Sequence, residues 1–379
     1  MQTGLFYACY PVIICFIFAD MAAITSLKQT TRKRTIAIVV LAILMVLMLW
    51  ASGYPRLIEH YYSEGVYPLI CHILHPVMNL LPFSVGDILY IAVTGYFIYA
   101  LVKLVILTVK KRFAQAGVLA MGLIIGVQTA FVMFYLFWGL NYFRPTAGER
   151  LNLRDTNYTT AHLEDVTHKL IDSANAYRSL LTRADTVRSN NEIYQSAISA
   201  ILKLSSDSVN FRTYSPHLKP SLLTPLLNYI GTSGYYNPFT SESQLNYQMP
   251  YFERPVTTCH ELSHQTGFGA EDEADFAGYI AGVGSADRLL KYSAYQLGVT
   301  ECMRALRYRD TSANNAMKRF ISPKVRYDII QQRLYWMKYR GQLNAFSGIF
   351  YDNFLKANNQ PHGLGTYDQM VLLLMAWYK

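Results

Sequence analysis

Two histidines separated by three residues give the strongest chemical signal in this 379-residue sequence, within the segment Cys259-His260-Glu261-Leu262-Ser263-His264. On a helix, His260 and His264 lie one turn apart on the same face, so their imidazoles can bind a single zinc ion. The intervening Glu261 is then placed to act on a water molecule rather than on the metal. The pattern predicts a zinc hydrolase site in which Glu261 is the general base.

An acidic cluster follows the histidines and can complete the site, because catalytic zinc usually takes three protein ligands. Gly267 and Gly269 should end the first helix, and a second helix should begin at Glu271. Glu271 and Asp275 would share a face of that helix, whereas Glu273 would point to the other side. We expect Glu271 to be the third ligand and Asp275 to accept a hydrogen bond from a ligand imidazole. The alternative is that these acids only form a charged helix start at the surface.

Two neighbouring residues narrow the class of site. A metzincin would carry a histidine at the position of Ala270, so that class is excluded. Cys259 is expected to be a small buried hydrophobic residue rather than a ligand. The five cysteines of the chain are scattered and do not form a disulfide framework.

The first 143 residues contain several apolar runs long enough to cross a bilayer, which requires roughly 20 residues. Three spans are expected at about 35–54, 88–109 and 117–142. A weaker fourth candidate covers 5–24, and the alternative there is an N-terminal extension that does not insert.

The net charge of +9 comes almost entirely from two basic clusters between these runs, which contain no acid. The clusters are Lys28, Arg32, Lys33 and Arg34, followed by Lys103, Lys110, Lys111 and Arg112. The positive-inside rule places both clusters in the cytoplasm, and the two assignments agree across the three spans. Residues 144–379 are therefore expected to form an extracytoplasmic domain, and the charge gives no reason to expect nucleic-acid binding.

The loop between the first two spans, residues 55–86, contains a short apolar stretch at 66–81. We expect this stretch to form an interfacial or re-entrant helix.

The region 144–379 is predicted to be mainly α with a minor sheet, a zincin-like α+β domain. Helices are expected at about 159–182, 191–204, 289–308 and 325–355, and Pro255 should open the helix that carries the histidines. Short β-like pieces are expected around 234–236 and 244–249. The piece Gln244–Met249 is our candidate for an edge strand that holds an extended peptide. An ordinary loop covering the site is the alternative.

The chain resembles a bacterial membrane family catalogued as domain of unknown function 3810, over about residues 35–379. The matching stretches are 59–68 (EHYYSEGVYP), 81–87 (LPFSVGD), 138–142 (WGLNY), 234–240 (GYYNPFT), 260–265 (HELSHQ), 271–276 (EDEADF) and 354–358 (FLKAN). Members of this family are similar to gluzincin-type metallopeptidases. The resemblance implies an integral protein of the bacterial inner membrane with a periplasmic catalytic domain. Asp275 matches the acid that CAAX-type membrane proteases carry after their ligand glutamate.

Two functions of different classes remain open. The first is a membrane-anchored zinc metallopeptidase whose cofactor is Zn²⁺ and whose partners are a peptide or protein substrate and the lipid bilayer. It also needs an oxyanion donor, for which Tyr279, Tyr292 and Tyr295 are the nominated candidates. The second is a membrane scaffold or sensor with a structural or absent metal. A carboxylate between the histidines favours the first, because a structural zinc site has no use for it.

Overall fold

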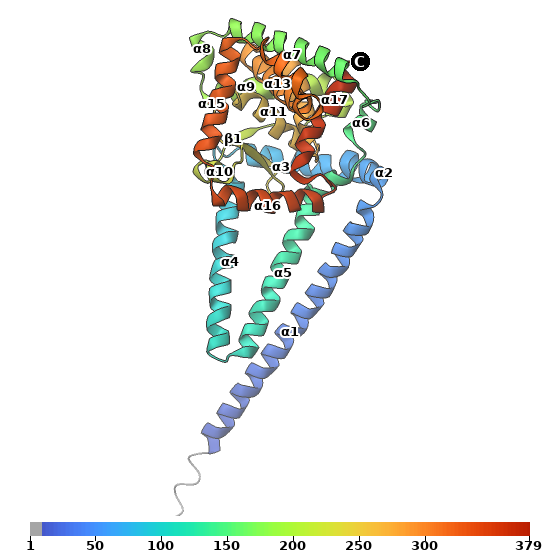
Figure 1. Ribbon diagram of the computed structural model, residues 1–379. Coiled ribbons are helices and arrows are strands. Elements are labelled where there is room, and N and C mark those ends of the chain that lie inside the picture. The colour runs from blue at the N-terminus through green and yellow to red at the C-terminus, as the bar shows by residue number, and fades with distance from the viewer. Residues whose placement is uncertain (1–9) are drawn as a thin grey trace, which may run out of the picture. The chain divides into compact units, whose positions relative to one another are not determined.

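The computed structural model describes the backbone of residues 10–379 and the side chains of residues 28–379 (Figure 1). The chain forms two compact units. Unit 1 contains the residues up to Trp50 together with Tyr90–Tyr135, and unit 2 contains Ala51–Leu89 together with Leu136–Lys379. The expected division at residue 143 assigned the loop at 55–86 to the membrane region, whereas its contacts place it within unit 2.

Unit 1 is formed by three long helices, a few end residues of which belong to unit 2. They are α1 (Tyr10–Ser52), α4 (Val85–Val109) and α5 (Phe113–Phe137). Three segments of these helices are long and apolar enough to cross a membrane, namely Lys28–Ser52, Val85–Val109 and Phe113–Phe137. Their apolar side chains are largely exposed, which a lipid environment would favour. The fourth candidate span, 5–24, begins in residues 1–9, which lie outside the described residues.

The third helix ends earlier than expected. It stops at Phe137 rather than near Tyr142, because Gly139–Phe143 form a 3₁₀ turn (η2) whose first four residues are buried in unit 2.

Unit 2 begins with short elements and then becomes mainly helical (Figure 1). Its first elements are α2 (Pro55–Leu57), the π-helix η1 (Ile58–Val66), α3 (Tyr67–Asn79), η2, α6 (Ala147–Arg150), α7 (Thr160–Leu180), α8 (Arg183–Thr186), α9 (Asn190–Asp207) and η3 (Val209–Phe211). The small sheet follows, with the strands β1 (Leu218–Pro220), β2 (Gly234–Asn237) and β3 (Glu242–Leu245). Helix α10 (Thr224–Ile230) lies between β1 and β2 in the chain. The remaining helices are α11 (Arg254–Gln265), α12 (Glu271–Gly284), α13 (Arg288–Arg309), α14 (Thr311–Lys318), α15 (Pro323–Lys338), α16 (Gln342–Ala357), η4 (Gly363–Gln369) and α17 (Met370–Trp377).

The core of unit 2 forms where α7, α9, α12 and α13 pack around α11 and one another. In α7, the residues that repeat at helical spacing are all buried, as predicted: Leu163, Val166, Leu170, Ile171 and Ala174. Most of α11 is also buried, so the helix that carries the histidines lies inside the unit rather than on its surface. Surrounding helices therefore fix its position.

The sheet has the order β1–β3–β2, with β3 parallel to β1 and antiparallel to β2. The proposal that Gln244–Met249 forms an edge strand is wrong. Its ordered part belongs to β3, the central strand, whose backbone is already paired on both sides. The edge strands are β1 and β2, and of these β2 packs more extensively on the motif helix α11.

One other expected element is divided. The helix expected over 325–355 is two helices, α15 and α16, separated at 339–341. Gly341, directly before α16, has an extended backbone, which interrupts the helical path.

Candidate metal centre

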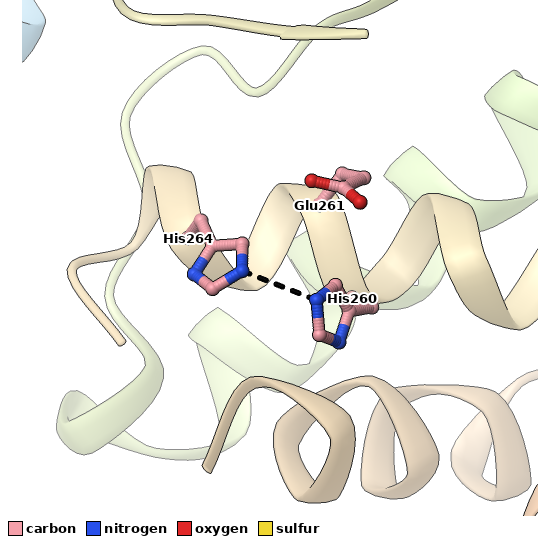
Figure 2. Close-up of side chains that lie close together, drawn as sticks. All are labelled: His260, Glu261 and His264. Atoms are coloured by element: carbon pink, nitrogen blue, oxygen red, sulfur yellow. Dashed lines mark hydrogen bonds between the residues drawn. The ribbon is translucent and has the colours of Figure 1, made fainter. Parts of the chain in front are cut away.

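Helix α11 brings the two histidines together. Pro255 occupies the first turn, where its missing N–H has no helical partner to lose. His260 and His264 project from the same face, and their Nε2 atoms lie 3.1 Å apart (Figure 2). Both side chains are buried. The helix therefore presents two convergent nitrogen atoms in a space shielded from solvent.

Glu271 completes the cluster from the start of α12. The chain turns after α11 at Gly267, whose φ of +89° suits glycine, and α12 begins at Glu271. Glu271 Oε2 lies 3.2 Å from His260 Nε2 and 3.5 Å from His264 Nε2. Ligand atoms bound tetrahedrally to zinc at about 2.0–2.1 Å are separated by about 3.3–3.4 Å. The three atoms therefore have the mutual spacing of three corners of a zinc tetrahedron.

Each of the two imidazole rings is oriented by a hydrogen bond from Nδ1, the ring nitrogen that points away from the cluster. His260 Nδ1 donates to Asp275 Oδ1 at 2.7 Å, which is the role expected for Asp275. His264 Nδ1 donates to the carbonyl of Phe268 at 2.7 Å. Both hydrogen bonds leave Nε2 as the nitrogen that faces the cluster, and such outer contacts usually orient metal-binding imidazoles.

Glu261 lies beside this cluster but differs from Glu271. Its ligand atom is within 4.8 Å of those of both histidines, so distance alone would allow it to bind a metal. A single Glu271 oxygen lies close to both Nε2 atoms, which favours Glu271 over Glu261 as the expected third ligand. In Figure 2, Glu261 projects from a different side of α11 than the two rings. Its Oε2 is buried and has no hydrogen-bond partner among the described residues.

The surroundings of Glu261 suit proton transfer. Burial raises the pKa of this carboxyl group to about 7, although the two histidines act in the opposite direction. A general base works best when its pKa is near the working pH. Gly234, at the start of β2, lies so close that an added Cβ would be 2.6 Å from Glu261 Oε1. The edge strand and the candidate base are therefore neighbours.

The cluster favours a positive charge. Burial alone would lower the pKa of His260, but Asp275, Glu271 and Glu261 together raise it well above its usual value. The same acidic surroundings would favour a bound cation.

Residues from the C-terminal region also contribute to the site, although no sequence pattern identified them as site residues. Tyr351 on α16 donates to Glu271 Oε1 at 2.6 Å. Gln360 accepts a hydrogen bond from the Glu271 backbone N–H at 3.1 Å. The ring of Tyr367 stacks 6.5 Å from that of His260. No local spacing links these residues to the motif, because the hydrogen bonds to Glu271 span 80 and 89 positions and Tyr367 comes 107 positions after His260. Only folding brings them there.

The nominated tyrosines lie elsewhere, so that prediction is wrong. Tyr279 is buried in the core, where its hydroxyl pairs with that of Tyr378. Tyr292 donates to Asp328, and Tyr295 stacks on Tyr177. Cys259 behaves as expected: it is fully buried in an apolar cluster, and burial raises the pKa of its thiol.

The segment that follows α5 makes hydrogen bonds at the C-terminal end of the motif helix α11. Trp138 Nε1 donates to the His264 carbonyl at 2.9 Å, and Arg144 donates to the Gly267 carbonyl at 3.1 Å. From α3, the Tyr67 hydroxyl donates to the Gln265 carbonyl at 2.8 Å. The bonds to His264 and Gln265 give carbonyl groups in the last turn of α11 additional partners, and the bond to Gly267 holds the turn that follows. They also explain why residues on either side of the candidate spans belong to unit 2.

The described residues form a mainly helical protein with three helices that could cross a membrane and a buried His-His-Glu cluster. The chain belongs to the family described as proteins of unknown function, DUF3810, whose model matches residues 62–375. This confirms the family noted in the sequence over these residues, whereas the similarity to gluzincin-type metallopeptidases stays a prediction. No curated protein and no solved structure matches the chain.

Proposed function

We propose that the protein is a membrane-anchored, zinc-dependent metallopeptidase whose zinc ligands are His260, His264 and Glu271. The observation that carries this proposal is the convergence of three ligand atoms at 3.1, 3.2 and 3.5 Å. Beside them lies a buried carboxylate oxygen with no hydrogen-bond partner in the part of the chain that the structure describes. Buried polar atoms normally have partners, so an unpaired one next to a ligand cluster is a natural place for a reacting water.

The chain's own residues would divide the reaction between them. Zinc would supply Lewis acidity, polarising a scissile carbonyl and lowering the pKa of water. Glu261 accepts the proton from the attacking water and passes it to the leaving amine. Asp275 and the Phe268 carbonyl keep the imidazoles oriented. Tyr367 is the candidate donor to the developing oxyanion, because its ring lies against His260 and burial raises the pKa of its hydroxyl, which keeps the group protonated.

A substrate peptide would extend the sheet along β2. This strand pairs with β3 on one side only, and its first residue, Gly234, adjoins Glu261. Main-chain pairing with an edge strand holds an extended peptide without demanding a particular sequence. This arrangement gives β2 the role that the sequence had assigned to Gln244–Met249.

Metal analysis of the detergent-purified protein tests the zinc assignment. We expect about one zinc ion per chain in the wild type and a substoichiometric amount in His264→Ala, because one of three ligands is lost. His168→Ala is the matched control, because His168 is a surface histidine on α7. Wild-type protein without a stoichiometric transition metal, or full zinc content in His264→Ala, would support a scaffold without this metal instead.

We also propose that unit 2 lies outside the cytoplasm of a bacterial inner membrane, with its site facing the periplasm. The support is the agreement of the two basic clusters with the positive-inside rule. A cysteine introduced at the exposed position Asn157 should react with a membrane-impermeant maleimide in intact spheroplasts. Reaction only after lysis would reverse the orientation.

A further inference from the structure

Helix α16 has an apolar outer face. Leu343, Phe346, Ile349 and Phe350 repeat at helical spacing, and the last three are 71%, 65% and 69% exposed. A helix at a water-facing surface normally turns its polar residues outward. Here large apolar side chains take that position.

The inner face of α16 carries polar residues that do specific work. Tyr351 donates to Glu271 in the candidate metal centre. Asn344 packs so closely on Gly231 that a Cβ there would clash with its amide. The helix is therefore held firmly in place, and its outward apolar face does not result from loose packing.

The two ends of α16 lie near the points where the chain leaves unit 2 for the candidate spans. Its N-terminal part packs on α10, and Leu222 just before α10 donates its N–H to Asp87 in the first turn of α4 at 2.7 Å. Near its other end, the ring of Phe354 lies 6.2 Å from that of Tyr142, which follows α5 closely in the chain. The helix thus runs along the side of unit 2 from which α4 departs and to which α5 returns.

The charge around α16 fits a lipid surface as well. From residue 329 to residue 351 the sequence contains Arg333, Lys338 and Arg340 but no acid. All three basic residues are exposed. Helices that lie in a bilayer interface combine apolar side chains with nearby basic residues that attract anionic headgroups.

A second helix repeats the pattern. On α3, an outward stripe of Leu69, Ile73, Val77 and Leu80 is exposed, while Tyr67 and His75 face the inside of unit 2. This helix lies between α1 and α4 in the chain, so two candidate spans flank it; the interfacial position expected for the stretch at 66–81 stays a prediction. Helix α16 is distant in sequence and gave no such signal.

We infer that α16 is an interfacial helix: its apolar face, Leu343, Phe346, Ile349 and Phe350, lies in the boundary between the headgroups and acyl chains of the bilayer. Because Tyr351 reaches Glu271 from the opposite face, the metal centre is then about one helix diameter, roughly 10 Å, from the lipid. One consequence rests on the proposed function: the substrate is a polypeptide segment lying at the membrane surface.

Photo-cross-linking of the full chain in vesicles tests this placement. Phe350 is replaced by p-benzoylphenylalanine, an aromatic replacement at an exposed position that should leave folding intact, and Phe346 serves as a second site. The control position is Val187, which is also 69% exposed but follows α8, far from α16 in unit 2 (Figure 1). Vesicles contain phosphatidylcholine and phosphatidylglycerol, and adducts are identified by mass spectrometry.

We expect phospholipid adducts at positions 346 and 350 to exceed those at 187 by at least about tenfold. Equal lipid labelling at the three positions would overturn the inference. So would cross-links to a second copy of the chain, or to residues 90–135 of the same chain, because either would cover this face with protein. The measurement requires neither zinc nor hydrolysis, so its outcome is independent of the proposed peptidase activity.

Discussion

A comparison of two buried polar clusters in unit 2 shows that they differ in how completely they are paired. In the first, Lys219 on β1 and Glu242 on β3 form an ion pair at 2.6 Å. The Lys219 ammonium also donates to the carbonyls of Met78 and Phe83 at 2.8 and 3.0 Å. The carboxylate of Glu242 also accepts the backbone N–H groups at the start of α4. Every charged atom in this cluster has a partner.

The second cluster is the candidate metal centre, and its polar atoms are not all paired. Three atoms that can each bind a metal approach one another, and Glu261 Oε2 has no hydrogen-bond partner among the described residues. A fully paired buried network stabilises one arrangement of the chain, whereas an incompletely paired one costs stability unless a ligand completes it. The difference fits a structural role for the Lys219 cluster and the ligand-binding role proposed for the histidine cluster.

The largest expected effect separates catalysis from stability at Glu261. Glu261→Gln keeps the size of the side chain but removes the base, so peptide hydrolysis should fall by about 10²–10⁴-fold. Zinc content and the unfolding temperature should remain near those of the wild type, because no hydrogen bond of Glu261 Oε2 is lost. Activity, metal content and thermal unfolding are measured on the same preparation.

The matched control is Glu253→Gln. Glu253 precedes α11, is buried, and has a pKa that burial raises to about 7, but its carboxylate accepts from Trp336 rather than facing the metal centre. The control should retain activity. If Glu261→Gln hydrolyses peptides as fast as the wild type, the peptidase assignment is wrong.

The two clusters also differ in how far they could be predicted from sequence. The residues from His260 to Asp275 form a recognisable pattern because two consecutive helices supply them with helical spacing. The Lys219 cluster joins β1, β3 and the start of α4, with no periodicity to connect them. Pairing between distant segments depends on tertiary packing, which local patterns do not specify.

The same limit applies to individual elements. Helices α7, α9, α11, α12 and α13 follow from apolar periodicity and helix-start signals, and the structure contains all five. Strand order does not follow from such signals, so the central strand β3 was mistaken for an edge. Tyr351 and Tyr367 were missed for a related reason: with 30 tyrosines in the chain, composition cannot select the two that fold over the site.

The second prediction concerns the ion pair between Lys219 and Glu242. Lys219→Met leaves Glu242 buried without its cation, and the loss should be about 3–5 kcal/mol of folding free energy. The midpoint of thermal unfolding in detergent should fall by roughly 10 °C. Lys203→Met, at an exposed lysine that also donates to a backbone carbonyl, is the control and should shift it little. A variant at Lys219 as stable as the wild type would show that the pair does not hold α4 to the sheet.

The smallest effect is expected at Asp275, which orients a ligand without touching the metal. Asp275→Ala removes the acceptor of the His260 Nδ1 proton, so the imidazole is free to rotate and its Nε2 is less basic. Losses of this kind weaken zinc binding by about 10–100-fold, or roughly 1.4–2.7 kcal/mol. Competition with a fluorescent zinc chelator measures the affinity.

Asp275→Asn sharpens this test, because the amide oxygen can still accept from Nδ1 while the charge is lost. Its zinc affinity should therefore lie between those of the wild type and Asp275→Ala. If the alanine variant binds zinc as tightly as the wild type, the hydrogen bond between His260 and Asp275 only stabilises the fold. Asp275 would then have a structural role like that of the Lys219 cluster. A graded loss across the two variants, with the unfolding temperature of the metal-free protein unchanged, would show that the bond acts on the ligand and not on the fold.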